Sequence, residues 1–223
     1  MTIEALVALV IAYLLGSIDF AVWVSRAKGV DIYQVGSGNP GTANVMRALG
    51  KRYAALVLVG DALKGLVAAG LGEAMGGSQA IGFAAGLAAV LGHCYPLWHR
   101  FRGGKGVATA GGVLAWLAPW ALAAFLVAYA LMVRLTGISS LGSLTGLALA
   151  LPVAALAGAG GWELVWLAGL VGLVFYRHQE NIRRLVRGEE RQLRASARLP
   201  GAQEPWVEPR VARGFTEDAR NED

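Results

Sequence analysis

The hydrophobic positions of this chain gather into long runs that short polar segments interrupt. The approximate bounds of these runs are 3–24, 53–75, 80–97, 107–133, 141–157 and 162–176. An α-helix needs about 20 apolar residues to cross the hydrocarbon core of a bilayer, so most of the runs are close to the length of one membrane-spanning helix. The pattern therefore predicts an all-α integral membrane protein.

The composition supports this class. Of the 223 residues, 56% are hydrophobic and only 16% are charged, and the mean hydropathy is +0.51. A soluble domain carries about 25% charged residues. The formal net charge of +5 is modest. We therefore expect membrane lipid around the protein and no nucleic acid among its partners.

Basic residues predict the orientation of the chain. They cluster between the first two runs, after the third run and after the last one, and the positive-inside rule places these three segments in the cytoplasm. An even number of crossings must separate two cytoplasmic segments, yet three runs lie between the second and the third. We therefore split the run 107–133 at Ala118-Pro119, because proline disfavours helix in the residue before it.

This split gives seven transmembrane helices, one of them short or half-spanning, with the amino terminus outside and the carboxyl terminus in the cytoplasm. The alternative count of five would require one helix of about 36 residues through Gly158-Ala-Gly-Gly161. We expect residues 1–187 to form one membrane domain. Residues 188–223 are polar and rich in proline, which predicts a cytoplasmic tail without fixed structure.

Three polar segments carry candidate chemistry, and we call 35–44, 102–107 and 178–181 the first, second and third islands. The first island mixes glycines with hydroxyl and amide side chains. Its candidate phosphate-binding residues are Gly36, Ser37, Gly38, Asn39, Gly41, Thr42 and Asn44, with Arg47 following. A helix that begins near Thr42 would direct N–H groups at an anion. The alternative is a flexible loop of turn residues.

The second island contains Gly103, Gly104, Lys105 and Gly106. It lacks the spacing and the Ser or Thr of a Walker A loop, which argues against an ATPase. A glycine turn at the start of a helix still presents backbone donors and an ammonium group to an anion. The alternative is a positively charged topology signal with a flexible turn.

The third island places His178 and Asn181 three residues apart, so a continuing helix would present them on one face. The histidine could transfer a proton or orient a hydroxyl group. A polar helix end that only caps the last span is the alternative.

Charged and polar residues also lie within the predicted spans. Asp61 and Lys64 are one helical turn apart, so each is a functional candidate unless the two simply pair with each other. His93 at a helix end is a structural histidine or a site residue. Asp19 in the first span has no partner close to it in the sequence.

The order and spacing of these residues closely resemble those of the bacterial membrane acyl-phosphate:glycerol-3-phosphate acyltransferases. The resemblance covers about residues 10 to 190. The segments that carry it are Gly16-Ser-Ile18, Val35 to Asn39, Gly41 to Arg47, Asp61-Ala-Leu-Lys-Gly65, Gly92-His93, Phe101 to Thr109 and His178-Gln-Glu-Asn181.

The resemblance implies transfer of a fatty acyl group from acyl phosphate to the sn-1 hydroxyl of glycerol 3-phosphate, giving lysophosphatidic acid and phosphate. This is the first acylation of phospholipid biosynthesis. It further implies a bacterial cytoplasmic membrane, an active site facing the cytoplasm, and no cofactor or metal.

The resemblance also assigns roles to particular residues. The implied catalytic residues are Ser37, Arg47, Lys105, His178 and Asn181, and the glycines of the first two islands would bind phosphate. Two positions depart from the family pattern. Asp19 stands where proline is usual, and Thr42-Ala43 reverses the usual order of those two residues.

Direct attack by the glycerol hydroxyl is favoured over an acyl-enzyme on Ser37, because no base for this serine is evident. The proton acceptor is either His178 or a substrate phosphate. An organic-anion transporter and a metal-dependent phospho-alcohol transferase are the alternative functions. The one-sided placement of the islands weakens the first. The second would need carboxylate clusters that these loops lack.

Overall fold

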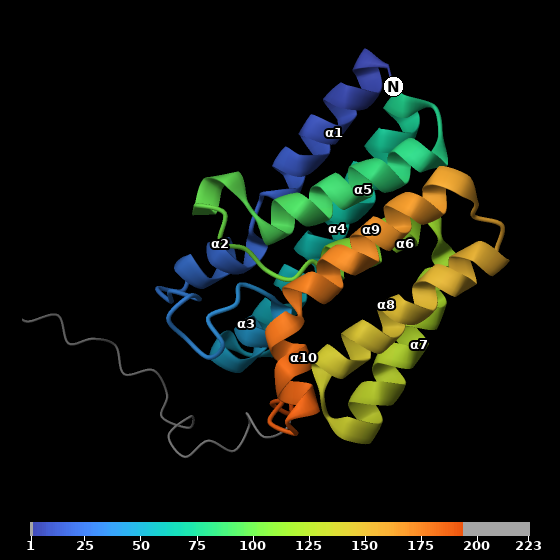
Figure 1. Ribbon diagram of the computed structural model, residues 1–223. Coiled ribbons are helices and arrows are strands. Elements are labelled where there is room, and N and C mark those ends of the chain that lie inside the picture. Colours follow the sequence, from blue (N-terminus) through green and yellow to red (C-terminus); the bar gives the residue numbers. More distant parts are fainter. Residues whose placement is uncertain (1, 194–223) are drawn as a thin grey trace, which may run out of the picture.

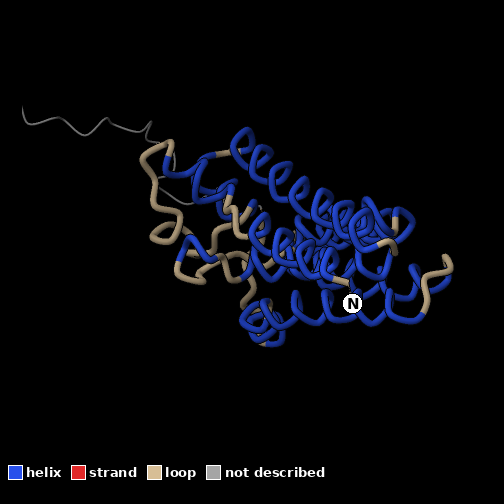
Figure 2. Tube along the Cα trace, turned by 90° about the horizontal axis from the view of Figure 1, so that it is seen from above, coloured by secondary structure: helices blue, strands red, loops and turns tan. Residues whose placement is uncertain are grey.

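The computed structural model describes residues 2–193, and these form helices and loops with no strand among them (Figures 1 and 2). The helices, with η1 a 3₁₀ turn, are α1 (Ile3–Gly16), α2 (Phe20–Arg26), α3 (Thr42–Leu49), α4 (Lys51–Gly76), α5 (Gln79–Cys94), η1 (Leu97–His99), α6 (Val107–Leu117), α7 (Pro119–Thr136), α8 (Ser139–Leu156), α9 (Gly161–Arg177) and α10 (Gln179–Val186).

Five segments of the described chain are long and apolar enough to cross a membrane. They are Ile3–Arg26, Lys51–Gly76, Gln79–His99, Pro119–Thr136 and Ser139–Leu156. Helices α6 and α9 are shorter, with 11 and 17 residues. The all-helical, multi-pass membrane class is thus confirmed, while the count of seven spans stays a prediction.

The break predicted within the longest apolar run is present. Helix α6 ends at Leu117, Ala118 leaves the helical conformation, and Pro119 is the first residue of α7. At 1.5 Å per residue α6 is about 16 Å long, well short of the ~30 Å hydrocarbon core. Proline is favourable at a first helical position because its missing N–H group would have no partner there.

A second break divides the first apolar run, which we expected to form one helix. Helix α1 ends at Gly16, and Asp19 precedes α2, where its Oδ1 accepts a hydrogen bond from the Val22 N–H at 3.1 Å. Asp19 is therefore an N-cap, a position that favours aspartate. This hydrogen bond accounts for one oxygen of a carboxylate that is unusual within an apolar run. The other, Oδ2, is enclosed without a hydrogen-bond partner in the described chain.

Helix α4 is central to the bundle and packs against α1, α5 and α6, whereas α7 packs mainly on α8. Glycine allows several of these approaches. A Cβ atom at Gly65 would lie 2.0 Å from the Thr109 carbonyl oxygen, and one at Gly112 would lie 1.9 Å from that of Ala62. Helix backbones in lipid come this close only where residues are small.

The first six residues of the predicted polar tail, 188–193, are described and pack against the bundle. The Leu193 N–H donates to the Gly137 carbonyl at 2.8 Å, and Glu190 hydrogen-bonds to residues of α8 and α10. Residues 194–223 lie outside the described part of the chain. The division into a membrane domain and a tail therefore stays a prediction.

In Figure 1, α3 and α10 lie at the lower end of the bundle and the amino terminus lies at the upper end. The first and third islands adjoin these two short helices, so both occupy the same end of the molecule. The first and third islands therefore lie together at one end of the apolar helices.

Candidate functional site

One cavity of about 1060 Å³ brings the three islands together. Its polar wall includes Ser37 of the first island, Lys105 of the second, His178 and Asn181 of the third, and Arg47. Its apolar wall comes from α4, α6 and α7, and includes Leu63, Leu66, Ala115, Leu122 and Phe125. The cavity therefore offers an anion-binding surface beside a lipid-like one.

The first island is held mainly by Asn44, which lies on α3. Its Oδ1 accepts from the Ser37 N–H at 3.0 Å, and its Nδ2 donates to the carbonyls of Ile32 and Val35 at 3.2 and 3.0 Å. Both polar atoms of this buried amide are thus engaged within the loop. Asn44, predicted as a phosphate-binding residue, shapes the loop in this structure.

Backbone donors of the first island are available where α3 begins. Gly41 precedes the helix in an extended conformation and supplies no side-chain cap, so the N–H groups of Thr42 and Ala43 have no helical partner. These residues line the cavity together with Arg47. Burial lowers the pKa of the half-buried Arg47 guanidinium, which stays cationic. The helix start is therefore suited to an anion.

The second island is fixed by a residue of α9. The Arg177 guanidinium donates from Nε to the Gly104 carbonyl at 3.1 Å and from Nη2 to the Gly103 carbonyl at 2.9 Å. Close packing explains the glycines, because a Cβ at Gly103 would lie 2.1 Å from the His93 carbonyl oxygen. Gly106 has φ +81°, the left-handed region that favours glycine.

Lys105 connects the second island to the third. Its ammonium donates a hydrogen bond to Oδ1 of Asn181. Burial lowers the pKa of Lys105 to about 8, with the Glu190 carboxylate opposing that change. The lysine thus carries a positive charge at neutral pH in a poorly solvated position, where a phosphate ligand would stabilise it.

His178 lies between α9 and α10 and is buried. Its Nδ1 lies 2.7 Å from the Val174 carbonyl oxygen, which can only accept, so Nδ1 carries the hydrogen. Burial lowers the pKa of this imidazole to about 4. A neutral ring with an unprotonated Nε2 follows, and that atom can accept a hydrogen bond from a hydroxyl group.

Comparison with known proteins places the chain in a family. A family model described as glycerol-3-phosphate acyltransferase matches residues 6–188. The chain belongs to the glycerol-3-phosphate acyltransferase family. Family members act in phospholipid synthesis, and the apolar helices agree with the integral membrane character of the solved relatives.

The relatives match this chain over nearly their whole length. The glycerol-3-phosphate acyltransferase of Anaeromyxobacter dehalogenans is 49% identical over 209 residues, which span 86% of this chain and 100% of the relative. Glycerol-3-phosphate acyltransferase 1 of Deinococcus radiodurans is 44% identical over 194 residues, spanning 86% of this chain and 98% of the relative.

Two solved structures have the same fold. The integral membrane glycerol 3-phosphate acyltransferase PlsY in its glycerol 3-phosphate form superposes with a TM-score of 0.80 at 40% identity, over 84% of this chain and 94% of PlsY. Its lysophosphatidic acid form gives a TM-score of 0.78 at 39% identity over the same shares.

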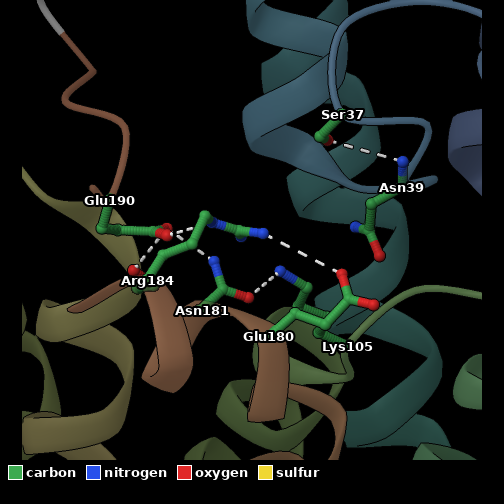
Figure 3. A network of polar contacts seen from close by, with 8 residues as sticks. Ser37, Asn39, Lys105, Glu180, Asn181, Arg184 and Glu190 are labelled. Carbon is green, nitrogen blue, oxygen red and sulfur yellow. Dashed lines mark hydrogen bonds and ion pairs between the residues drawn. The ribbon is translucent and has the colours of Figure 1, made fainter. Parts of the chain in front are cut away.

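Glu190 is a site residue that the sequence analysis missed. Its Oε1 accepts from Ser140 at 2.9 Å and from Nδ2 of Asn181 at 2.6 Å, and its Oε2 pairs with Arg184 at 2.7 Å. Figure 3 shows Glu190 and Arg184 linked through Asn181 to Lys105, with Ser37 and Asn39 across from them. The sequence feature that could have identified Glu190 was its position as an acidic residue in a strongly basic segment. The hydrogen bonds from Arg184 and Asn181 lower the pKa of this carboxyl despite desolvation, which raises it.

The buried charges of the predicted spans form a cluster beside the cavity. Asp61 and Lys64 pair at 2.8 Å, as expected for residues at i and i+3. Lys64 Nζ also donates to the Ile18 carbonyl at 2.7 Å and lies 2.9 Å from Nδ1 of His93. Ile18 belongs to the break between α1 and α2, so the cluster joins that break to α4 and α5.

Proposed function

We propose that this protein transfers a fatty acyl group from acyl phosphate to the sn-1 hydroxyl of glycerol 3-phosphate, releasing lysophosphatidic acid and phosphate. The observation that carries the proposal is the cavity in which the three polar islands, together with the cations Arg47 and Lys105, adjoin an apolar wall. Such a cavity suits two phosphorylated substrates, one of which carries an acyl chain. The glycerol 3-phosphate and lysophosphatidic acid forms of PlsY support the choice of acceptor and product.

In this proposal the residues around the three islands bind the phosphate groups of both substrates, acyl phosphate and glycerol 3-phosphate. Lys105 and Arg47 neutralise charge, and the N–H groups at the start of α3 and in the second island bind phosphate oxygens. The residues assigned to this binding are Gly36, Ser37, Asn39, Gly41, Thr42, Gly103 and Gly106. The N–H groups of Gly38 and Gly104, also predicted to bind phosphate, already donate to the Val35 and His93 carbonyls at 3.0 and 3.1 Å. Asn44 keeps the first island in shape, and Asn181 orients Lys105.

The glycerol hydroxyl attacks the acyl carbon directly, so one C–O bond forms while the C–O bond to phosphate breaks. Because phosphate is a good leaving group, the protein mainly aligns the substrates and stabilises the developing oxyanion. The low pKa of His178, about 4, argues against this residue as the general base. We assign the proton to a substrate phosphate oxygen, while Nε2 of His178 orients the hydroxyl.

We place the protein in the bacterial cytoplasmic membrane with seven spans, of which α6 is half-spanning. The amino terminus lies outside, and the cavity and carboxyl terminus face the cytoplasm. The position of the first and third islands at the end opposite the amino terminus supports this orientation. The reaction requires no cofactor or metal, because the leaving group already activates the acyl carbon.

The test uses the purified full-length chain in detergent with acyl phosphate and glycerol 3-phosphate. We expect lysophosphatidic acid acylated at sn-1 and inorganic phosphate in equal amounts, and no product when acyl-CoA replaces acyl phosphate. Mass spectrometry identifies the product and its regiochemistry. Absence of lysophosphatidic acid with folded protein would reject the function, and equal use of acyl-CoA would reject the donor.

A further inference from the structure

His93 lies where the first two islands meet, and no role has been assigned to it above. The ring is 5% exposed and lines the cavity near the end of α5. A Cβ atom at Gly104 would lie 2.2 Å from Nε2 of this ring and 2.6 Å from the Pro40 carbonyl oxygen. The imidazole therefore lies beside the backbone of both glycine-rich segments.

Lys64 determines which ring nitrogen carries the hydrogen. An ammonium group has three donors and no acceptor, and the three contacts of Nζ are to Asp61, the Ile18 carbonyl and Nδ1 of His93. Nδ1 must therefore accept. The distance of 3.5 Å from Nδ1 to the Asp61 carboxylate is too long for an N–H···O bond, which agrees with an unprotonated Nδ1. A neutral ring in this tautomer carries its hydrogen on Nε2.

Within residues 2–193 this Nε2 hydrogen has no hydrogen-bond acceptor, yet Nε2 is not among the polar atoms enclosed without a partner. It is therefore open to the cavity. The surroundings favour an anion, because Lys105 and the start of α3 adjoin the two backbone segments beside the ring. A fixed N–H donor in such a place can bind an oxygen of a ligand.

We propose that His93 is a substrate-contacting residue that donates its Nε2 hydrogen to a phosphate oxygen. Lys64 and Asp61 act as positioning residues, because they hold the tautomer that makes this donation possible. The inference rests on the proposed function, since glycerol 3-phosphate or acyl phosphate supplies the phosphate. A hydrogen bond to a charged ligand corresponds to a change of about 10- to 100-fold.

Three variants of the full-length enzyme test the contact by kinetics. His93→Phe keeps a ring but removes the donor, and we expect KM for one phosphorylated substrate to rise about 10- to 100-fold. His93→Gln places an amide donor near the position of Nε2 and should restore part of this loss. His99→Phe is the matched control, because His99 lies in η1 outside the cavity lining.

Separate KM values for glycerol 3-phosphate and for acyl phosphate identify which substrate supplies the oxygen. Wild-type constants for folded His93→Phe, or identical losses in His93→Phe and His93→Gln, would overturn the contact. If His93→Phe does not fold, the spectroscopic measurement on the wild-type protein decides the question.

Nitrogen NMR of ¹⁵N-histidine-labelled wild-type protein tests the tautomer and the contact without turnover. We expect the His93 ring to carry its hydrogen on Nε2 and not on Nδ1, and the Nε2 resonance to shift when glycerol 3-phosphate or inorganic phosphate is added. Lys64→Met should release the tautomer while Asp61→Asn/Lys64→Gln, which keeps an uncharged donor, should retain it. A protonated Nδ1, or no shift on saturation with both ligands, would overturn the inference. Such a result leaves acyl transfer by the wild type intact, so the two proposals fail separately.

Discussion

The first and second islands both bring glycine-rich backbone to one cavity, but different parts of the chain hold them. The first is held by Asn44, whose Oδ1 accepts a hydrogen bond from the Ser37 N–H, seven residues away. The second is held by Arg177, more than 70 residues away, and packs directly on His93. The first island should therefore tolerate changes elsewhere in the fold. The second depends on the relative positions of three helices, α5, α6 and α9.

The largest expected effect comes from the charge that the second island delivers. Lys105→Ala should lower kcat/KM about 100- to 1000-fold, because a cation facing the developing negative charge is lost. Lys51→Ala is the control, since this exposed lysine lies outside the cavity and should change activity less than twofold. The rate of lysophosphatidic acid formation measures both. Similar losses in the two variants would contradict the assigned site.

Two glycines, Gly41 of the first island and Gly104 of the second, should respond to an added methyl group to different degrees. Gly104→Ala places a Cβ against His93 and Pro40, which should cost about 1–3 kcal/mol and raise KM about tenfold or more. At Gly41 the Cβ would approach only the end of the Asn39 side chain, at 3.1 Å, so Gly41→Ala should change KM less than threefold. Thermal unfolding and KM for glycerol 3-phosphate provide the comparison. Equal effects would contradict the tighter packing at Gly104 than at Gly41.

Asn44→Ala tests the local support of the first island. The substitution leaves the Ser37 N–H and the Ile32 and Val35 carbonyls without their partner, which should cost about 1–3 kcal/mol. We expect a lower melting temperature and activity reduced about tenfold. Asn44→Asp keeps the acceptor for Ser37 and should lose less than the alanine variant. If the alanine variant retains full activity, the loop keeps its shape without this residue.

The smallest effect is a pH dependence of substrate binding. The pKa of Lys105 is lowered to about 8, so its positive charge is present below that pH and is lost as the pH rises through it. KM for the phosphorylated substrates should rise about twofold between pH 7 and pH 8 and more steeply above. Lys105→Arg, whose guanidinium stays charged, should remove this dependence. An unchanged profile in that variant would assign the dependence to another group.

Sequence reasoning predicted the helical membrane class and many of the residues that line the cavity more readily than it predicted their contacts. The break before Pro119 was predictable because proline acts on its own neighbour. The break at Asp19 was not, since an N-cap in the middle of an apolar run has no local pattern that distinguishes it from a buried charge. Glu190 was missed for a similar reason, because its three partners come from α8 and α10.

Membrane character follows from apolar composition, and the candidate phosphate-binding residues follow from local chemistry, so both were accessible without coordinates. A glycine turn or a helix start directs N–H groups wherever it occurs in a fold. Which nitrogen of His93 carries its hydrogen depends on Lys64, and the position of the second island depends on Arg177, so both are decided by atoms far apart along the chain. Hydrogen bonds act over about 3 Å, and the packing of α1, α4, α5 and α9 brings those atoms within that distance.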